Sequence, residues 1–60
     1  MSTVYNPEAD LIAEIERLEL DARETRRRAE HAKNEQDKRV LDKQLAETKQ
    51  RIELLRKRLP

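Results

Sequence analysis

Apolar or small residues recur along this chain in alternating steps of four and three residues. The first series is Leu11, Ile15, Leu18, Ala22, Thr25, Ala29 and Ala32, and the second is Leu41, Leu45, Thr48, Ile52, Leu55 and Leu59. This spacing is the heptad pattern, in which positions a and d form the stripe that one helix buries against another. The sequence therefore predicts two heptad helices.

The two series are out of phase on a single straight helix. Nine residues separate Ala32 from Leu41, and at about 100° per residue the two stripes would face opposite sides. A chain reversal over residues 33–37 removes this conflict, with Asn34 expected in a left-handed C-cap conformation and Asp37 as the cap of the second helix. We therefore predict a tail (residues 1–6) and a hairpin (7–60), made of a helix (7–33), a turn (33–37) and a second helix (37–59).

The start of the first helix is marked by the run Asn6-Pro7-Glu8. Asparagine is a good N-cap, proline suits the first helical position, and an acidic residue in the first turn interacts favourably with the helix dipole. These three residues predict a helix that begins at Pro7.

Folding the two series antiparallel brings their apolar positions opposite one another. The residue numbers add up to 70 in each facing pair, namely Leu11 with Leu59, Ile15 with Leu55, Leu18 with Ile52, Ala22 with Thr48, Thr25 with Leu45, and Ala29 with Leu41. The flanking e and g positions then pair opposite charges, with Glu14 facing Arg58, Asp21 facing Arg51, Glu19 facing Lys49, and Arg26 facing Asp42.

The predicted fold is all-α: an antiparallel two-helix hairpin (coiled coil) that associates into a helical bundle. An antiparallel dimer that exchanges helices between two chains has the same pairing and stays open as an alternative.

Composition narrows the function classes. Charged residues make up 45% of the 60 residues, Tyr5 is the single aromatic, and cysteine is absent, so neither a disulfide framework nor a thiolate zinc site can form. No apolar run is long enough for a membrane span or a signal peptide, and the net charge is only +1. We expect a cytoplasmic protein without a membrane partner.

Catalytic machinery is not indicated by these residues. A two-helix hairpin has no enclosed site in which to hold an acid, base or nucleophile, and we expect no enzyme, no catalytic residue and no cofactor. His31 and Glu35 have the four-residue spacing of a metal-ligand pair, but one such pair is a weak signal, and we expect a solvated histidine rather than a metal site.

Self-association is the function that the sequence favours most. A hairpin shields one stripe on each helix, and four large aliphatic residues, Ile12, Leu20, Val40 and Leu54, lie outside positions a and d. We expect these residues to form a protein interface, either between copies of this chain or with a second protein. The predicted function is that of a small homo-oligomeric adaptor, inhibitor or assembly subunit.

Binding of an anionic ligand, either nucleic acid or a nucleotide, is the alternative. The turn half of the predicted hairpin is rich in arginine, and the candidate phosphate contacts are Arg23, Arg26, Arg27, Arg28 and Arg39. Tyr5 is expected to pack against the open end of the hairpin near Leu59, whereas in the alternative it stacks on a planar group of the ligand. A solvated charged surface is the explanation that we favour for the same arginines, because acidic residues among them offset their charge and no aromatic residue is nearby to stack on a base. The heptad pattern itself indicates an architecture and no particular function.

Overall fold

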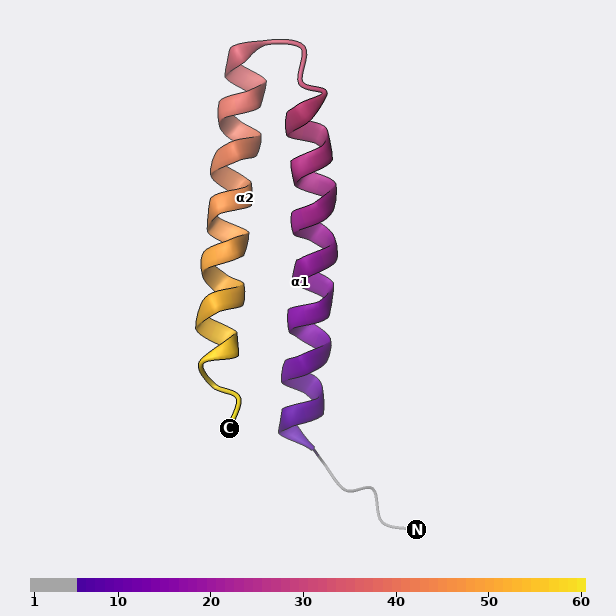
Figure 1. The fold of residues 1–60 in the computed structure, drawn as a ribbon, viewed down its shortest axis with the longest axis vertical. Helices are drawn as coiled ribbons and strands as arrows, with labels where there is room; N and C mark the ends of the chain where they lie inside the picture. Colours follow the sequence, from indigo (N-terminus) through magenta and orange to yellow (C-terminus); the bar gives the residue numbers. More distant parts are fainter. Residues whose placement is uncertain (1–5) are drawn as a thin grey trace.

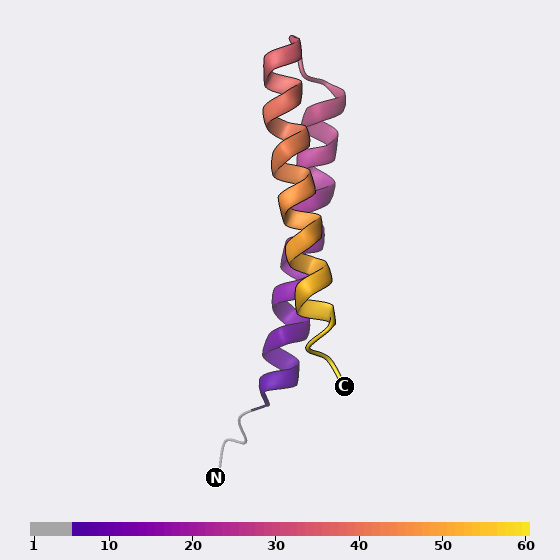
Figure 2. The ribbon, with the colours of Figure 1, turned by 90° about the vertical axis from the view of Figure 1, so that its left-hand side faces the viewer.

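The computed structural model describes residues 6–60 and consists of two helices, α1 (Pro7–Glu30) and α2 (Glu35–Arg56). They run antiparallel and lie side by side in Figure 1, and Figure 2, turned by 90°, shows α2 in front of α1, in a molecule that measures 54 × 23 × 11 Å. The predicted all-α antiparallel hairpin is confirmed. The predictions made for Tyr5 and for the first five residues of the tail lie outside the described residues.

The beginning of α1 has the predicted cap. The Asn6 backbone is extended, and its side-chain oxygen accepts hydrogen bonds from the backbone N–H groups of Glu8 (3.1 Å) and Ala9 (3.3 Å). Pro7, which has no N–H to satisfy, is the first helical residue, and Asp10 joins Glu8 in the acidic first turn. The sequence run Asn6-Pro7-Glu8 therefore starts the helix as predicted.

The turn is built differently from the prediction. Helix α1 ends at Glu30 rather than at residue 33, and α2 begins at Glu35 rather than at residue 37. Asn34 has φ −142° and ψ 163°, so the predicted left-handed conformation is wrong, and within residues 6–60 no residue has a positive φ.

Asn34 instead caps the start of α2. Its side-chain oxygen accepts a hydrogen bond from the backbone N–H of Asp37 at 2.8 Å, and its amide donates to the Asp37 carboxylate at 3.2 Å. Asp37 is therefore the third residue of the helix and not its cap. The physical reason is that an asparagine with extended backbone satisfies an otherwise free N–H at the helix start, which a left-handed residue at the preceding helix end would not do.

The end of α2 also falls short of the predicted boundary. The helix ends at Arg56 rather than at residue 59, with Lys57 as its C-cap. Beyond Arg56 the backbone tightens, with the N–H groups of Arg58 and Leu59 donating to carbonyls three residues earlier, and Pro60 disfavours the helical conformation in Leu59. Leu59 is nevertheless only partly exposed and packs against the core.

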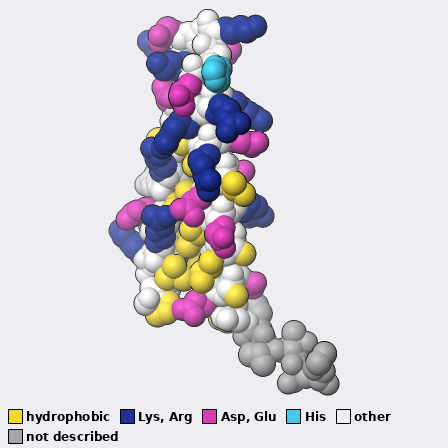
Figure 3. Space-filling model, turned by 45° about the vertical axis from the view of Figure 1, so that its right-hand side comes forward, with side chains coloured by type: hydrophobic (Ala, Val, Ile, Leu, Met, Phe, Trp, Pro, Cys, Tyr) yellow, Lys and Arg dark blue, Asp and Glu magenta, His cyan; other side chains and the backbone are white. Residues whose placement is uncertain are grey.

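The core follows the heptad positions. All thirteen predicted a and d residues are buried or half-buried, and among residues 6–60 the only others that are not exposed are Glu14 and Glu19. Ile15, Ile52 and Leu55 form the buried cluster, and the residues packed against it are Leu11, Leu18, Ala22 and Leu59. This cluster occupies the open end of the hairpin, where the space-filling view shows hydrophobic side chains gathered, whereas charges of both signs crowd towards the turn (Figure 3).

Candidate interaction surfaces

The hairpin is a narrow slab whose two broad faces are distinguished by heptad position. We call the side that carries the e positions of both helices the e face, and the side that carries the g positions the g face. The e positions are Ile12, Glu19, Arg26, Asp42, Lys49 and Arg56, and the g positions are Glu14, Asp21, Arg28, Gln44, Arg51 and Arg58. Because side chains of both helices contribute to each face, either face offers a surface that neither helix has alone.

The four aliphatic residues proposed as an interface are all exposed. The exposed fractions are 44% for Ile12, 59% for Leu20, 52% for Val40 and 56% for Leu54. Their heptad positions place Ile12 on the e face, Leu20 on the outer side of α1, and both Val40 and Leu54 on the g-face side of α2. The structure therefore does not join them into one patch, and their role in an interface stays a prediction.

The arginines proposed as phosphate contacts are divided among different sides of the hairpin. Arg23 and Arg26 line a groove on the e face, whereas Arg28 lines a groove on the g face beside acidic residues. Arg27, between Arg26 and Arg28, is exposed at the outer heptad position f, and Arg39 is exposed near the start of α2. Consecutive helical residues are about 100° apart, so the Arg26-Arg27-Arg28 run does not make one basic surface.

The e-face groove brings together charged side chains from both helices. It has a volume of about 380 Å³, and its floor is formed by Ala22 and Ile52. Its rim carries four cations and two carboxylates, namely Arg23, Arg26, Lys49, Arg56, Glu19 and Glu53. Lys49 and Arg56 are not among the predicted phosphate contacts. Their e positions in the second heptad series, which place them on the same face as Arg26, could have identified them from the sequence.

The g-face groove has the opposite charge balance. Its volume is about 400 Å³, and its lining includes three carboxylates and one arginine, Asp21, Glu24, Glu47 and Arg28. Thr25, Gln44 and Thr48 complete it. At this level of the hairpin one broad face is therefore mainly cationic and the other mainly anionic.

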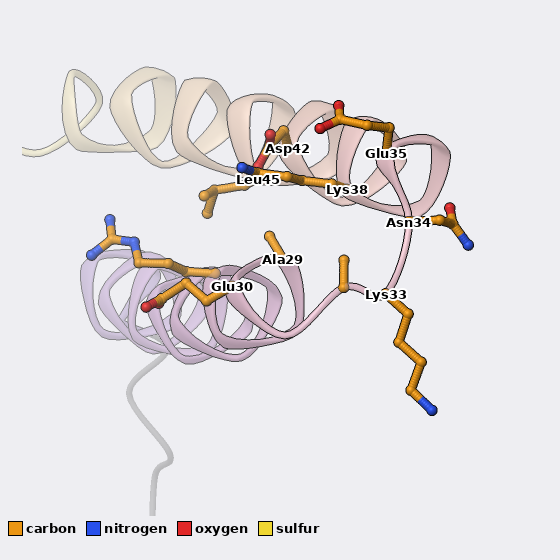
Figure 4. A pocket seen from close by; sticks show the side chains of 10 residues that line it. Ala29, Glu30, Lys33, Asn34, Glu35, Lys38, Asp42 and Leu45 are labelled. Atoms are coloured by element: carbon orange, nitrogen blue, oxygen red, sulfur yellow. The ribbon is translucent and has the colours of Figure 1, made fainter.

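A third groove, of about 470 Å³, lies between the helices next to the turn. Leu45 extends from α2 towards Ala29 of α1, whereas the side chains of Lys33 and Asn34 point away from the gap (Figure 4). Its charged lining is balanced, with three cations (Arg26, Lys33 and Lys38) and three carboxylates (Glu30, Glu35 and Asp42). This balance gives the turn groove no clear preference for an anion or a cation.

Two ion pairs connect the helices, and each is formed by one of the two half-buried glutamates of α1. The Arg51 guanidinium lies 3.5 Å from the Glu14 carboxylate, and that of Arg56 lies 2.6 Å from the Glu19 carboxylate. Both pairs join the predicted flanks, g with g and e with e. Each glutamate nevertheless pairs with an arginine one heptad away from the predicted partner on α2.

The predicted charge partners are therefore wrong in detail. Within residues 6–60 no ion pair forms between Glu14 and Arg58, Asp21 and Arg51, Glu19 and Lys49, or Arg26 and Asp42. Arg58 lies beyond the end of α2, so the helix does not hold it opposite Glu14. The long arginine stem also lets a guanidinium reach along the flank to a carboxylate at another level.

We expect reversal of both glutamates, Glu14→Arg with Glu19→Arg, to lower the free energy of unfolding by about 1 kcal/mol, because two ion pairs are replaced by like-charge contacts. Adding Arg51→Glu and Arg56→Glu should restore much of that loss, as measured by thermal or urea unfolding in a double-mutant cycle.

The matched control reverses the partners that heptad positions predict, Arg58→Glu with Lys49→Glu. These changes are made in the variant that carries Glu14→Arg and Glu19→Arg. This combination should restore less, since neither residue forms an ion pair with Glu14 or Glu19. Equal rescue by both combinations, or strictly additive effects in the first, would contradict the observed pairing.

Among residues 6–60 no three His, Cys, Asp or Glu side chains are grouped so that they could hold a metal ion, and His31 is exposed. Neither α1 nor α2 combines the length and apolar character needed to cross a bilayer.

Comparisons with known proteins give no further indication of function. No protein-family model, curated protein or solved structure matched this chain. Its function is therefore argued from the exposed aliphatic residues and the two charged grooves.

Proposed function

We propose that this protein is a small non-enzymatic helical hairpin that self-associates and acts by binding protein, as an adaptor, inhibitor or assembly subunit. The observation that carries the proposal is the contrast between a small core and four large aliphatic residues that remain exposed. Ile15, Ala29, Ile52 and Leu55 are the buried hydrophobic residues among residues 6–60, and no side chain there is more than 98% buried.

The exposed aliphatic residues supply the second half of the argument. The described part of this hairpin exposes four large aliphatic residues, as many as it has buried hydrophobic residues. Burying Leu20 or Leu54 against another chain would remove further apolar area from water and so stabilise the folded hairpin. Association would then supply stability that a two-helix core of this size lacks.

If folding is coupled to association, the melting temperature should rise with protein concentration, because mass action favours the assembled native state. Leu54→Glu and Leu20→Glu should each weaken association by more than about 1 kcal/mol while the hairpin itself loses about 0.5 kcal/mol or less. Sedimentation equilibrium and thermal unfolding over a wide concentration range measure both effects.

Gln50→Glu is the matched control, because Gln50 is an exposed residue at an outer heptad position of α2 and presents no aliphatic side chain. It should leave the mass distribution unchanged. A monomeric mass at all concentrations, together with indifference to both leucine substitutions, would reject self-association and leave binding of a different protein.

Binding of an anionic ligand is supported by a separate observation, the e-face groove with its four cations. In that case a short DNA duplex should bind, and its affinity should fall steeply between about 50 and 200 mM salt as counterions are released. Arg23→Gln with Lys49→Gln should then reduce the salt dependence. The two carboxylates on the same rim, Glu19 and Glu53, make this the second candidate.

A further inference from the structure

We infer that copies of this chain associate by placing the e-face groove of one copy against the g-face groove of the next. The inference rests on the proposed self-association and names the two surfaces that meet; Leu20, on the outer side of α1, lies outside this contact, so Leu20→Glu tests self-association in general and not the pairing of the grooves. Its basis is the placement of charged side chains that form no ion pair: cations of this kind line the groove on the e face, and carboxylates of this kind line the groove on the g face of the same hairpin.

The cationic surface is on the e face. Of the four cations on the rim of that groove, Arg56 is already paired with Glu19. The other three, Arg23, Arg26 and Lys49, are exposed and form no ion pair with any carboxylate within residues 6–60. They are available to a partner on that side.

The anionic surface is on the g face. Asp21, Glu24 and Glu47 line its groove, are exposed, and form no ion pair among the described residues 6–60. The one arginine in the groove, Arg28, leaves carboxylates in excess there. Among the described residues without an ion pair, the e-face groove therefore holds three cations and one carboxylate, Glu53, and the g-face groove holds three carboxylates and one arginine, so the two grooves carry equal and opposite excess charge.

The two sets of charges also lie at the same height along the hairpin. Because facing core residues have numbers that add up to 70, Lys49 is level with Asp21, and Glu47 is level with Arg23. The six residues therefore fall within five residue steps of α1, or about 8 Å of helix length. A second copy placed alongside in the same direction would bring the cations opposite the anions without any axial shift.

Aliphatic residues at the open end fit the same arrangement. Ile12 is exposed on the e face, and Leu54 is exposed on the g-face side, level with Glu16 of α1. The axial offset between Ile12 and Leu54 is then four residue steps, or about 6 Å, and the spacing of about 8 to 10 Å between the two helix axes adds to it, so each side chain packs on the surface of the neighbouring copy at the same end of the stack. An inverted copy would move Ile12 to the turn end of its neighbour, far from Leu54. Exposed ion pairs contribute little energy individually, so the charges set orientation while the aliphatic contact adds affinity.

The symmetry of the assembly follows from these surfaces. Each copy presents a cationic groove on one broad face and an anionic groove on the opposite face, so the contact joins two different surfaces. Such a contact cannot be satisfied by a two-fold dimer; it repeats, either as an open stack or as a closed ring. The average mass should therefore continue to rise beyond that of a dimer as concentration increases, or stop at a ring.

The decisive experiment uses two triple variants of the full chain. The first, Arg23→Glu with Arg26→Glu and Lys49→Glu, has two anionic faces; the second, Asp21→Lys with Glu24→Lys and Glu47→Lys, has two cationic faces. Each alone should associate at least about tenfold more weakly than the unmodified chain, because like charges then meet. An equimolar mixture should associate again into alternating assemblies, as measured by sedimentation velocity with circular dichroism to verify the helices.

The matched control reverses three cations at outer heptad positions, Arg27→Glu with Lys43→Glu and Lys57→Glu, and so changes the net charge by the same amount as the first variant. It should associate like the unmodified chain at about 150 mM salt, where long-range effects of net charge are largely screened. If a triple variant loses its helices, the unmodified chain still tests the inference, because its association should weaken as salt is raised from about 50 to 500 mM.

The outcomes separate the inference from the function on which it rests. Association of the unmodified chain that survives both triple reversals, or that is not restored by mixing, would overturn the pairing of the grooves and leave self-association intact. An unmodified chain that stays monomeric would reject both the pairing of the grooves and self-association. Binding of a DNA duplex by that monomer, lost in the first variant, would assign the e-face groove to nucleic acid instead.

Discussion

Leu55→Ala is expected to lower the free energy of unfolding by about 3 kcal/mol, the usual cost of removing a buried leucine side chain. Leu55 is the most buried residue of the core, with 4% of its surface exposed, and it packs in one cluster with Ile15 and Ile52. A hairpin with so few buried residues has little else to compensate, so circular dichroism should show a chain that is mainly unfolded at room temperature.

The adjacent leucine gives the matched control. Leu54 is 56% exposed, so Leu54→Ala should cost the hairpin itself about 0.5 kcal/mol or less. Any larger effect should depend on protein concentration and vanish on dilution, because it would come from the proposed interface. Equal losses for the two leucines in dilute solution would contradict the observed core.

The second large effect concerns a covalent link across the core. Ala22→Cys with Thr48→Cys places cysteines at facing a and d positions, both half-buried in the structure. Under dilute oxidising conditions they should form a disulfide within one chain. Closing a loop of that length should raise the free energy of unfolding by about 3 kcal/mol, because the cross-link restricts the unfolded chain. Non-reducing electrophoresis and urea unfolding measure the two results.

The control for this link is Arg27→Cys with Lys43→Cys, whose residue numbers also add up to 70. Both residues are exposed at outer heptad positions, so their side chains diverge and should not cross-link within a chain. Exclusively intermolecular disulfides from Ala22→Cys with Thr48→Cys would indicate the dimer that exchanges helices. Absence of any cross-link would contradict the core pairing.

The turn illustrates how far local sequence rules extend. The sequence predicted a reversal near the junction of the two heptad series, because two stripes half a turn out of phase cannot share a partner on one straight helix, but the observed turn, residues 31–34, lies earlier than predicted and includes Ala32 of the first series. It did not assign the roles of Asn34 and Asp37, since asparagine is common both at helix starts and in left-handed C-caps. The structure assigns Asn34 to the start of α2, through its hydrogen bond with the Asp37 backbone N–H.

The charged flanks illustrate a different limit. Heptad positions predicted which sides of the helices would exchange ion pairs, and the pairs of Glu14 and Glu19 lie on those sides. They did not predict the partners, because a long arginine side chain reaches more than one level of the opposite helix. For Glu14, the early end of α2 also removed the predicted partner, Arg58, from the helix.

The sequence by itself determined the fold of this protein and the residues of its core, since the a and d spacing and the constant sum of facing residue numbers are properties of one chain read along its length. Only the tertiary structure decided which charges share a surface. Arg26 and Arg28, only two positions apart in the sequence, lie on opposite faces, whereas Arg23 and Lys49, far apart in sequence, line one groove. The physical reason is that the helical turn separates neighbours by about 100° each, and the groove between two helices unites residues that only their packing brings to the same level.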